Sequence, residues 1–307
     1  MRSIIATLLV VSALAGCAAS APVPVATPDV PLPDGVWSQE AMIASRDTQI
    51  PVTYVIPPSA NEQALPLVLL VHGHGGTREE AGAFTRLAAQ LAARGIASIR
   101  MDFPGCGESE EPFYNNNLTN MKADVLSAYE YVQRWAYIDL NRVGIVGFSM
   151  GGRIAAELSQ DGERYAAMVL WAGALENGAS EFTNMLGGEA EYAALKELAR
   201  TEGYVPYETF WGQKQQLGAQ WFDDLEASMP LDAIERYTGS LLLIHGQADE
   251  VVPPVVSRRA EAAAGNAAVV SLIEIPGADH GFGLFNDQPQ FSVELIDQTV
   301  RFLSREL

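Results

Sequence analysis

The chain has 307 residues, which is enough for one large α/β domain or for a domain with an inserted cap. Hydrophobic residues make up 48% of it and aromatic residues 8%, as in an ordinary folded protein. Its formal net charge of −19 gives a surface that repels phosphate backbones, which argues against nucleic acid as a partner.

The N-terminus has the pattern of a targeting segment. In "MRSIIATLLVVSALAGC", the basic Arg2 precedes an apolar run over residues 4–14 that is too short to span a bilayer as a stable helix. This predicts an export signal peptide over residues 1–16. The end of the stretch, Leu-Ala-Gly-Cys17, resembles the lipobox of bacterial lipoproteins. The resemblance implies that Cys17 carries several acyl chains and anchors the chain in the bacterial cell envelope, at the periplasmic face or the cell surface. Simple cleavage after Ala15 is the alternative.

Residues 17–35 are rich in Pro and Ala and nearly free of charge, which predicts an extended, semi-rigid tether. The folded domain is expected over residues 36–307. With Cys17 lipidated, Cys106 is the only thiol left, so no intrachain disulfide is possible. Cys106 lies in "PGCGES" next to acidic residues, a setting that disfavours a thiolate, and we interpret it as a small loop residue.

The first predicted elements are strands. Residues 37–58 read as two strands around a polar turn at residues 46–47. The continuous apolar run over residues 65–71 is typical of a strand buried on both faces of a parallel sheet, and it ends in "HGHGG".

A helix and a further strand follow that motif. Thr77 and Glu80 have the spacing of a capping box, which predicts a helix from there to about Arg94. The next strand ends at Asp102, and a helix is expected over residues 119–137.

The remaining elements alternate between strand and helix. They are a strand, sharp turn and helix over 142–160, strands over 166–173 and 239–249, a helix over 254–264, a strand and loop over 269–282 and an amphipathic helix over 292–307. This alternation predicts an α/β fold with a mostly parallel sheet and helices on both faces. In such sheets the functional site lies at the carboxyl ends of the strands.

The segment from about residue 175 to 237 interrupts the alternation and reads as helices and loops. Because a structureless loop of this length is improbable in a compact domain, we predict an inserted helical cap. The segment is rich in aromatic residues: Phe182, Tyr192, Tyr204, Tyr207, Phe210, Trp211, Trp221 and Phe222. They either line a pocket for a flat or apolar acyl group or pack the cap onto the sheet.

The stretch "GFSMG" matches G-x-S-x-G between a predicted strand and a predicted helix, the setting of a nucleophile elbow. Small residues are needed at Gly147 and Gly151 so that the turn can close and present Ser149. The helix N-terminus beneath the serine also favours developing negative charge. The alternative is a glycine-rich turn with an idle serine.

A serine nucleophile needs a base, and the base needs an orienting carboxylate. Asp249 and His280 both follow later predicted strands and are the candidates for orienter and base. Glu250 is a weaker rival of Asp249. Asp279 is expected to point away from the His280 ring.

The series "HGHGG", "DFPGCGES", "GFSMGG", "LIHGQADEVVP" and "GADHGF" resembles the α/β-hydrolase superfamily from about Val52 to the end, apart from the cap. The chain is most similar to feruloyl/cinnamoyl esterases and to dienelactone-hydrolase-like and small peptidase-like hydrolases. Dienelactone hydrolases proper differ, since they carry cysteine at the position of Ser149. The resemblance implies the α/β-hydrolase fold, with Ser149 as nucleophile, Asp249 as orienter, His280 as base and no cofactor.

The "HGHGG" motif raises the possibility of a metal site, but two histidines without a third nearby ligand do not make one, and no metal is predicted. The resemblance implies instead that the backbone N–H groups of His74 and Met150 form the oxyanion hole. The ring of His74 is then free to line the pocket. His72 is expected to brace the loop by hydrogen bonds, and His245 to be structural.

These features favour a serine hydrolase that acts on small-molecule carboxylic esters, including aromatic ones. A peptidase or amidase with the same triad is the alternative, although the chain lacks the propeller-sized extension of prolyl oligopeptidases. A non-catalytic surface lipoprotein on a hydrolase scaffold is the remaining alternative.

Overall fold

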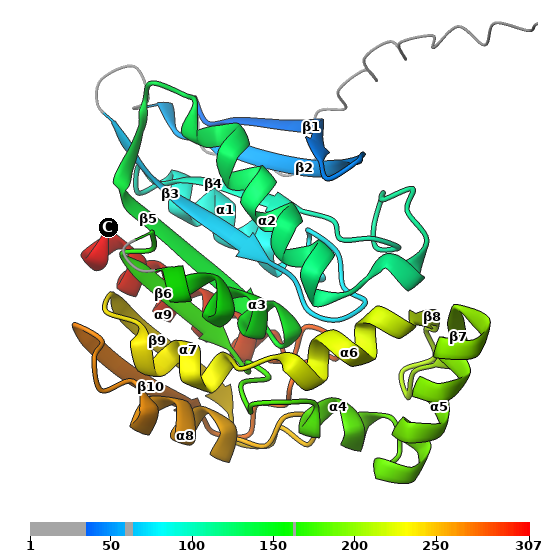
Figure 1. Ribbon diagram of the computed structural model, residues 1–307. Coiled ribbons are helices and arrows are strands. Elements are labelled where there is room, and N and C mark those ends of the chain that lie inside the picture. Colours follow the sequence, from blue (N-terminus) through cyan, green and yellow to red (C-terminus); the bar gives the residue numbers. More distant parts are fainter. Residues whose placement is uncertain (1–34, 59–63, 162–163) are drawn as a thin grey trace, which may run out of the picture.

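The computed structural model describes residues 35–58, 64–161 and 164–307, and shows a central sheet covered by helices (Figure 1). The predicted signal peptide over residues 1–16, Cys17, and the tether up to residue 34 lie outside the described residues. Within the described ranges, no helix is both long and apolar enough to cross a membrane.

Eight strands form the main sheet in the order β1-β2-β4-β3-β5-β6-β9-β10. Their bounds are β1 Trp37–Ser45, β2 Thr48–Ile56, β3 Leu65–Val71, β4 Ala97–Met101, β5 Ile138–Phe148, β6 Ala167–Trp171, β9 Ser240–Gly246 and β10 Val269–Ile275. Strand β2 pairs antiparallel with β1 and β4, and every pairing from β4 to β10 is parallel. The predicted mostly parallel sheet is therefore confirmed.

Burial on both faces explains the apolar strands. All seven residues of β3 are buried. Leu67 and Leu69 belong to the core on one face of the sheet, whereas Val68 and Leu70 belong to the core on the other. Because successive side chains alternate between the faces, a strand covered on both sides must be apolar throughout.

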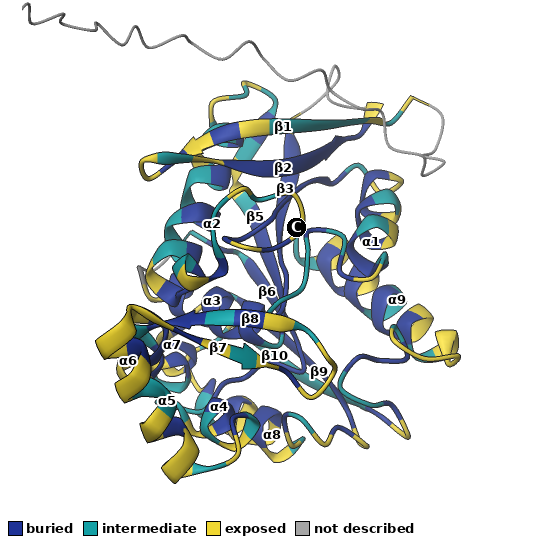
Figure 2. Ribbon diagram, turned by 90° about the vertical axis from the view of Figure 1, so that its right-hand side faces the viewer, coloured by how far each residue is buried: buried dark blue, intermediate teal, exposed yellow. Residues whose placement is uncertain are grey.

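Helices cover both faces of this sheet. Their bounds are α1 Ala83–Ala92, α2 Leu118–Gln133, α3 Met150–Leu158, α7 Pro230–Arg236, α8 Val255–Ala263 and α9 Pro289–Glu306, with short 3-10 turns at η2 Phe113–Asn115 and η3 Ser159–Asp161. Helices α1 and α9 lie on one face, while α2 and α3 lie on the other (Figure 2). The loops after β3, β5, β9 and β10 all emerge at the carboxyl end of the parallel strands.

The capping box predicted at Thr77 and Glu80 was wrong. Helix α1 begins only at Ala83, after an N-cap at Gly82. The Glu80 carboxylate instead accepts the backbone N–H of Gly73 at 2.8 Å, in the loop after β3. Its side chain is therefore engaged by a tertiary contact and does not turn back to a local helix start.

An insertion between β6 and β9 forms the cap. Its elements before α7 are α4 Ser180–Met185, α5 Glu189–Glu202, β7 Tyr204–Glu208, β8 Lys214–Gly218 and α6 Ala219–Ala227. Most of the insertion lies at the right of Figure 1. The prediction of helices and loops missed the antiparallel β7–β8 hairpin. In β7 only Val205 is buried and Pro206 interrupts the pattern, so the strand signal is weak.

Candidate active site

Ser149 stands on a strained turn between β5 and α3. Its backbone has a φ of 52° and a ψ of −116°, outside the regions that L-residues commonly adopt. A Cβ at Gly147 would overlap the backbone of Gly151, and one at Gly151 would overlap the carbonyl oxygen of Val71. The sharp turn therefore needs glycine at both positions.

Ser149, His280 and Asp249 form one chain of hydrogen bonds. The Ser149 Oγ lies 3.0 Å from Nε2 of His280, and Nδ1 of His280 lies 2.7 Å from Oδ2 of Asp249. The three side chains come from the loops after β5, β10 and β9, and the fold brings them together across 131 and 31 residues of chain. An ionised Asp249 can only accept, so Nδ1 of His280 carries a proton, and in the neutral imidazole Nε2 can accept the serine O–H.

The surroundings of Asp249 keep it ionised. Burial would raise its pKa, but hydrogen bonds from His245 and His280 outweigh burial and lower that pKa to about 2. The other carboxylate oxygen, Oδ1, accepts the N–H groups of Val251 and Val252 at 2.9 and 2.8 Å. Asp249 is thus fixed in place by its own loop.

His245 is buried and structural, as predicted, but its contact with Asp249 was not foreseen from the sequence. Its Nε2–H donates to Val252 O at 2.8 Å and to Asp249 Oδ2 at 3.1 Å, and its Nδ1 accepts the Ser257 hydroxyl at 2.6 Å. The four-residue spacing of His245 and Asp249 across one strand end was the available signal. His245 supports the carboxylate that orients His280.

The rivals of Asp249 lie elsewhere or have other partners. Asp279 accepts the N–H of Gly283 and the side-chain amide of Asn286, at 2.9 and 2.8 Å, so it turns away from the ring of His280 as predicted. Glu250 is exposed. Asp249 is the carboxylate that contacts the imidazole of His280.

The loop after β3 lies against Ser149, since a Cβ at Gly73 would be 3.4 Å from the Cβ of Ser149. His72 is buried and donates from Nδ1 to the Gly73 carbonyl at 2.8 Å, while its Nε2 accepts the Phe103 N–H at 3.2 Å. The predicted bracing role of His72 is therefore confirmed. The Gly76 N–H also donates to the Gly73 carbonyl, at 3.1 Å.

These bonds orient the next amide. In a trans peptide the C=O and N–H groups point in opposite directions. Because the Gly73 carbonyl is held on one side, the N–H of His74 is directed to the other. Within the described part of the chain, the N–H groups of His74 and Met150 donate to no protein acceptor. Both are available to an anion beside Ser149.

The His74 ring is enclosed and neutral. Burial lowers its pKa to about 4, and its Nε2 lies 2.8 Å from Oε1 of Gln215 in the cap. The rings of Phe113, Phe182 and Trp221 pack around it at centroid distances of 5.5, 6.4 and 5.8 Å. Aromatic side chains therefore pack between the loop after β3 and the cap.

The family model described as "Alpha/beta hydrolase family" matches residues 68–295, most of the chain. The chain belongs to the α/β hydrolase family. This agrees with the resemblance drawn from the motifs and assigns the protein to the hydrolases.

A curated relative and several solved structures are similar to this hydrolase. It is 32% identical over 117 residues to the quorum-quenching protein AidA of Acinetobacter baumannii, a match that covers 38% of each chain. Its fold resembles that of Est1E from Butyrivibrio proteoclasticus with bound ferulic acid, with a TM-score of 0.66 at 19% identity over 86% of this chain and 98% of that one. A monoacylglycerol lipase from Paleococcus ferrophilus gives 0.64 at 18% identity, over 84% and 99%. A hypothetical protein from Pseudomonas aeruginosa gives 0.71 at 17% identity, over 93% and 100%.

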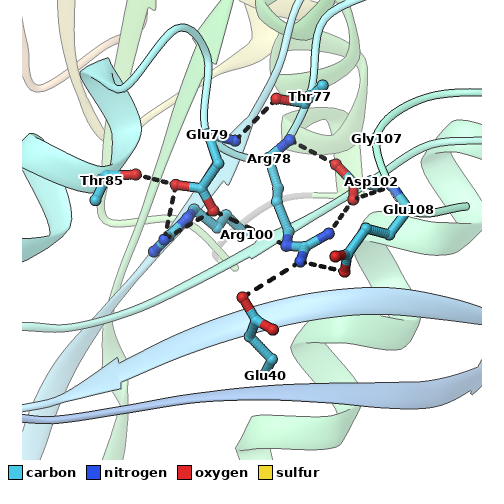
Figure 3. A pocket seen from close by; sticks show the side chains of 9 residues that line it. All are labelled: Glu40, Thr77, Arg78, Glu79, Thr85, Arg100, Asp102, Gly107 and Glu108. Atoms are coloured by element: carbon cyan, nitrogen blue, oxygen red, sulfur yellow. Dashed lines mark hydrogen bonds and ion pairs between the residues drawn. The ribbon is translucent and has the colours of Figure 1, made fainter. Parts of the chain in front are cut away.

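A charged cavity of about 350 Å³ lies in the hydrolase between the loops after β3 and β4, and it is not lined by Ser149, Asp249 or His280 (Figure 3). Arg78 pairs with Asp102 and, at 2.6 Å, with Glu108, and Arg100 lies 3.1 Å from Glu79. The Arg78 N–H also donates to Asp102, at 2.7 Å. These contacts connect the loop after β3 to the loop after β4, so we assign the charged residues around the cavity a structural role.

Cys106 belongs to the second of these loops. It is buried, and the side-chain amide of Asn116 lies 3.5 Å from its Sγ. Burial raises the pKa of the thiol to about 12, so it stays protonated at neutral pH. This agrees with its interpretation as a loop residue without a catalytic role.

Proposed function

We propose that the chain is a serine hydrolase that cleaves small-molecule carboxylic esters through an acyl-enzyme on Ser149. The observation that carries this proposal is the continuous hydrogen-bonded chain from Ser149 Oγ through His280 to Asp249. An ionised Asp249 accepts the Nδ1–H of His280, which directs Nε2 of the neutral imidazole toward Ser149, the arrangement a general base needs.

The reaction follows from these positions. Ser149 Oγ attacks the ester carbonyl carbon while its proton passes to His280 Nε2. The carbonyl oxygen becomes an oxyanion and accepts the N–H groups of His74 and Met150. His280 then returns the proton to the departing alkoxide, which leaves as an alcohol. Water attacks the acyl-enzyme with His280 again as base, and release of the acid restores Ser149.

The acyl side of the substrate is apolar or aromatic in this proposal. Phe113, Phe182 and Trp221, all nearly fully buried, pack around the His74 ring, whose backbone N–H is a proposed oxyanion donor. The Butyrivibrio neighbour binds ferulic acid, and another neighbour is a monoacylglycerol lipase, names that fit an ester with such an acyl group.

A fluorophosphonate probe tests the nucleophile. The expected result is a single adduct on Ser149, which the Ser149→Ala variant does not form. A folded wild-type protein that remains unlabelled would contradict catalysis by this serine.

A panel of matched substrates tests the reaction class. Methyl esters of hydroxycinnamates and of short aliphatic acids should be hydrolysed, with the aromatic esters preferred, and turnover should not respond to a chelator. Faster hydrolysis of a matched anilide would assign the chain to the amidases instead.

We also propose that the hydrolase is exported and held at the membrane through a lipid on Cys17. The lipobox-like sequence before Cys17 supports this. Expressed in bacteria, the full chain should fractionate with membranes, and mass spectrometry should find acyl groups on Cys17. Cys17→Ala should move the protein out of the membrane fraction with kcat unchanged, and a wild-type chain with an unmodified Cys17 would refute the anchor.

A further inference from the structure

Two glutamine side chains of the cap contact the loop after β3, called the oxyanion loop below because it carries the proposed donor His74. Gln213, just before β8, donates from Nε2 to the Gly75 carbonyl at 3.0 Å. Gln215, on β8, accepts from Nε2 of His74 at 2.8 Å and donates from its own Nε2 to Gln213 Oε1 at 3.0 Å. The cap thus contacts both residues that follow Gly73 in the loop.

The polarity of this network is fixed by its ends. The Gly75 carbonyl can only accept, so Gln213 must present its NH₂ group there and its oxygen to Gln215. Gln215 then presents its oxygen to His74, whose Nε2 must carry the proton. Trp211 donates to the same Gln213 oxygen at 3.3 Å, in agreement with this orientation.

The loop is shaped for this contact. Gly75 has a φ of 67°, and a Cβ there would overlap the side-chain amides of Gln213 and Gln215. Only glycine therefore lets the cap come this close to the loop backbone. Gln215 is 3% exposed, so its hydrogen bonds are shielded from competing water.

The contacts lie on both sides of the His74 amide, the proposed oxyanion donor. His72 and Gly76 hold the carbonyl of Gly73, just before the His74 N–H. The cap holds the His74 ring and the carbonyl of Gly75, just after it. The backbone cannot rotate this N–H away without breaking a hydrogen bond on one side or the other.

We propose that Gln213 and Gln215 are positioning residues that hold the oxyanion hole in its active geometry, an inference that rests on the proposed function. The cap is then part of the catalytic apparatus as well as a wall of the site. Its glutamines should affect the transition state, where the oxyanion exists, more than the bound substrate.

The test replaces each glutamine by methionine, which keeps the length and removes the amide. For Gln213→Met and Gln215→Met we expect kcat on a hydroxycinnamate methyl ester to fall roughly 10-fold to 100-fold, with KM within about twofold of wild type. Gln216→Met is the matched control. Gln216 lies on the same strand, half-buried, and in the described structure has no hydrogen bond to the loop, so kcat should stay unchanged.

A trifluoromethyl ketone separates positioning from a purely structural role. Ser149 adds to its carbonyl carbon and the proton passes to His280, so the hemiketal oxygen occupies the oxyanion hole. Its inhibition constant should rise in Gln213→Met and Gln215→Met by the same factor by which kcat/KM falls. If the substitutions only made the cap less rigid, KM would rise instead, and the inhibition constant would not follow kcat/KM.

The outcomes distinguish this inference from the proposed function. A wild type without ester turnover or Ser149 labelling contradicts both. An active wild type whose glutamine variants keep wild-type kcat, or change KM alone, contradicts only the positioning role. Gln213 is half-buried near the exposed tip of the hairpin, so Gln213→Met keeps the test decisive if Gln215→Met melts at a lower temperature.

Discussion

The sheet scaffold and the cap hold their parts of the site in different ways. In the scaffold, local contacts shape the loops: Asp249 accepts the N–H groups of Val251 and Val252, two and three residues away. In the cap, Gln213 and Gln215 bond to partners 138 and 141 residues away. The proposed reacting groups therefore stand at strand ends that contacts within their own loops hold, whereas the loop after β3, with the proposed oxyanion donor, also depends on an inserted segment.

The largest effect is expected where the scaffold holds the base. His280→Ala removes the proton acceptor of Ser149 and should lower kcat about 10⁴-fold to 10⁶-fold. His74→Ala keeps its backbone N–H and loses the bond to Gln215 and the ring packing against the cap, so roughly a tenfold loss is expected. Steady-state kinetics on one ester measure both variants. Equal losses of kcat in the two variants would contradict the view that His280 reacts while the His74 ring only positions the loop.

The next largest effect concerns the orienting carboxylate. Asp249→Asn presents an amide to His280 Nδ1, favours the wrong tautomer and should lower kcat about 10⁴-fold. His245→Phe removes one of the hydrogen bonds to Asp249 and leaves those from its own loop, so a loss of about tenfold is expected. Single-turnover acylation rates measure the loss in each of these two variants. A larger loss of acylation rate in His245→Phe than in Asp249→Asn would contradict a role of His245 limited to holding Asp249 in place.

The same contrast explains how much the sequence could predict. Strand β3 could be predicted because a run of seven apolar residues that ends in a glycine-rich turn is typical of a strand covered on both faces. Ser149, Asp249 and His280 could be proposed as a group because each follows a predicted strand, and parallel strands end at one edge of the sheet. The contacts of Gln213 and Gln215 left no local signal, since only the folded cap brings them to the loop. The helix start was predicted wrongly at Glu80 because its carboxylate accepts the N–H of Gly73 in the preceding loop, a contact that the local helix pattern does not reveal.

Glu80 gives a medium effect, on stability rather than on rate. Burial raises its pKa from 4.5 to about 7. The unfolded chain then loses this proton at lower pH than the folded one, so the wild type loses stability as pH rises from about 4.5 to 7 and levels off above. Glu80→Gln removes that loss, which is on the order of 3 kcal/mol at about 1.4 kcal/mol per pKa unit. Denaturant unfolding at several pH values checks this, and parallel pH curves for the two proteins would contradict it.

The smallest effect is expected at the tip of the cap. Phe210 is 68% exposed and packs edge-on against Trp211, which is itself 46% exposed. Phe210→Ser should therefore change the free energy of unfolding by less than about 0.5 kcal/mol. Because the tip lies next to Gln213, which holds the Gly75 carbonyl, an ester long enough to reach it should show a KM raised severalfold in this variant. A short acetate ester is the control, and an equal change in KM for both esters would place the tip outside the substrate path. If only the long ester responds, the cap contributes to binding through its tip and to the transition state through its glutamines, two separable roles within one hairpin.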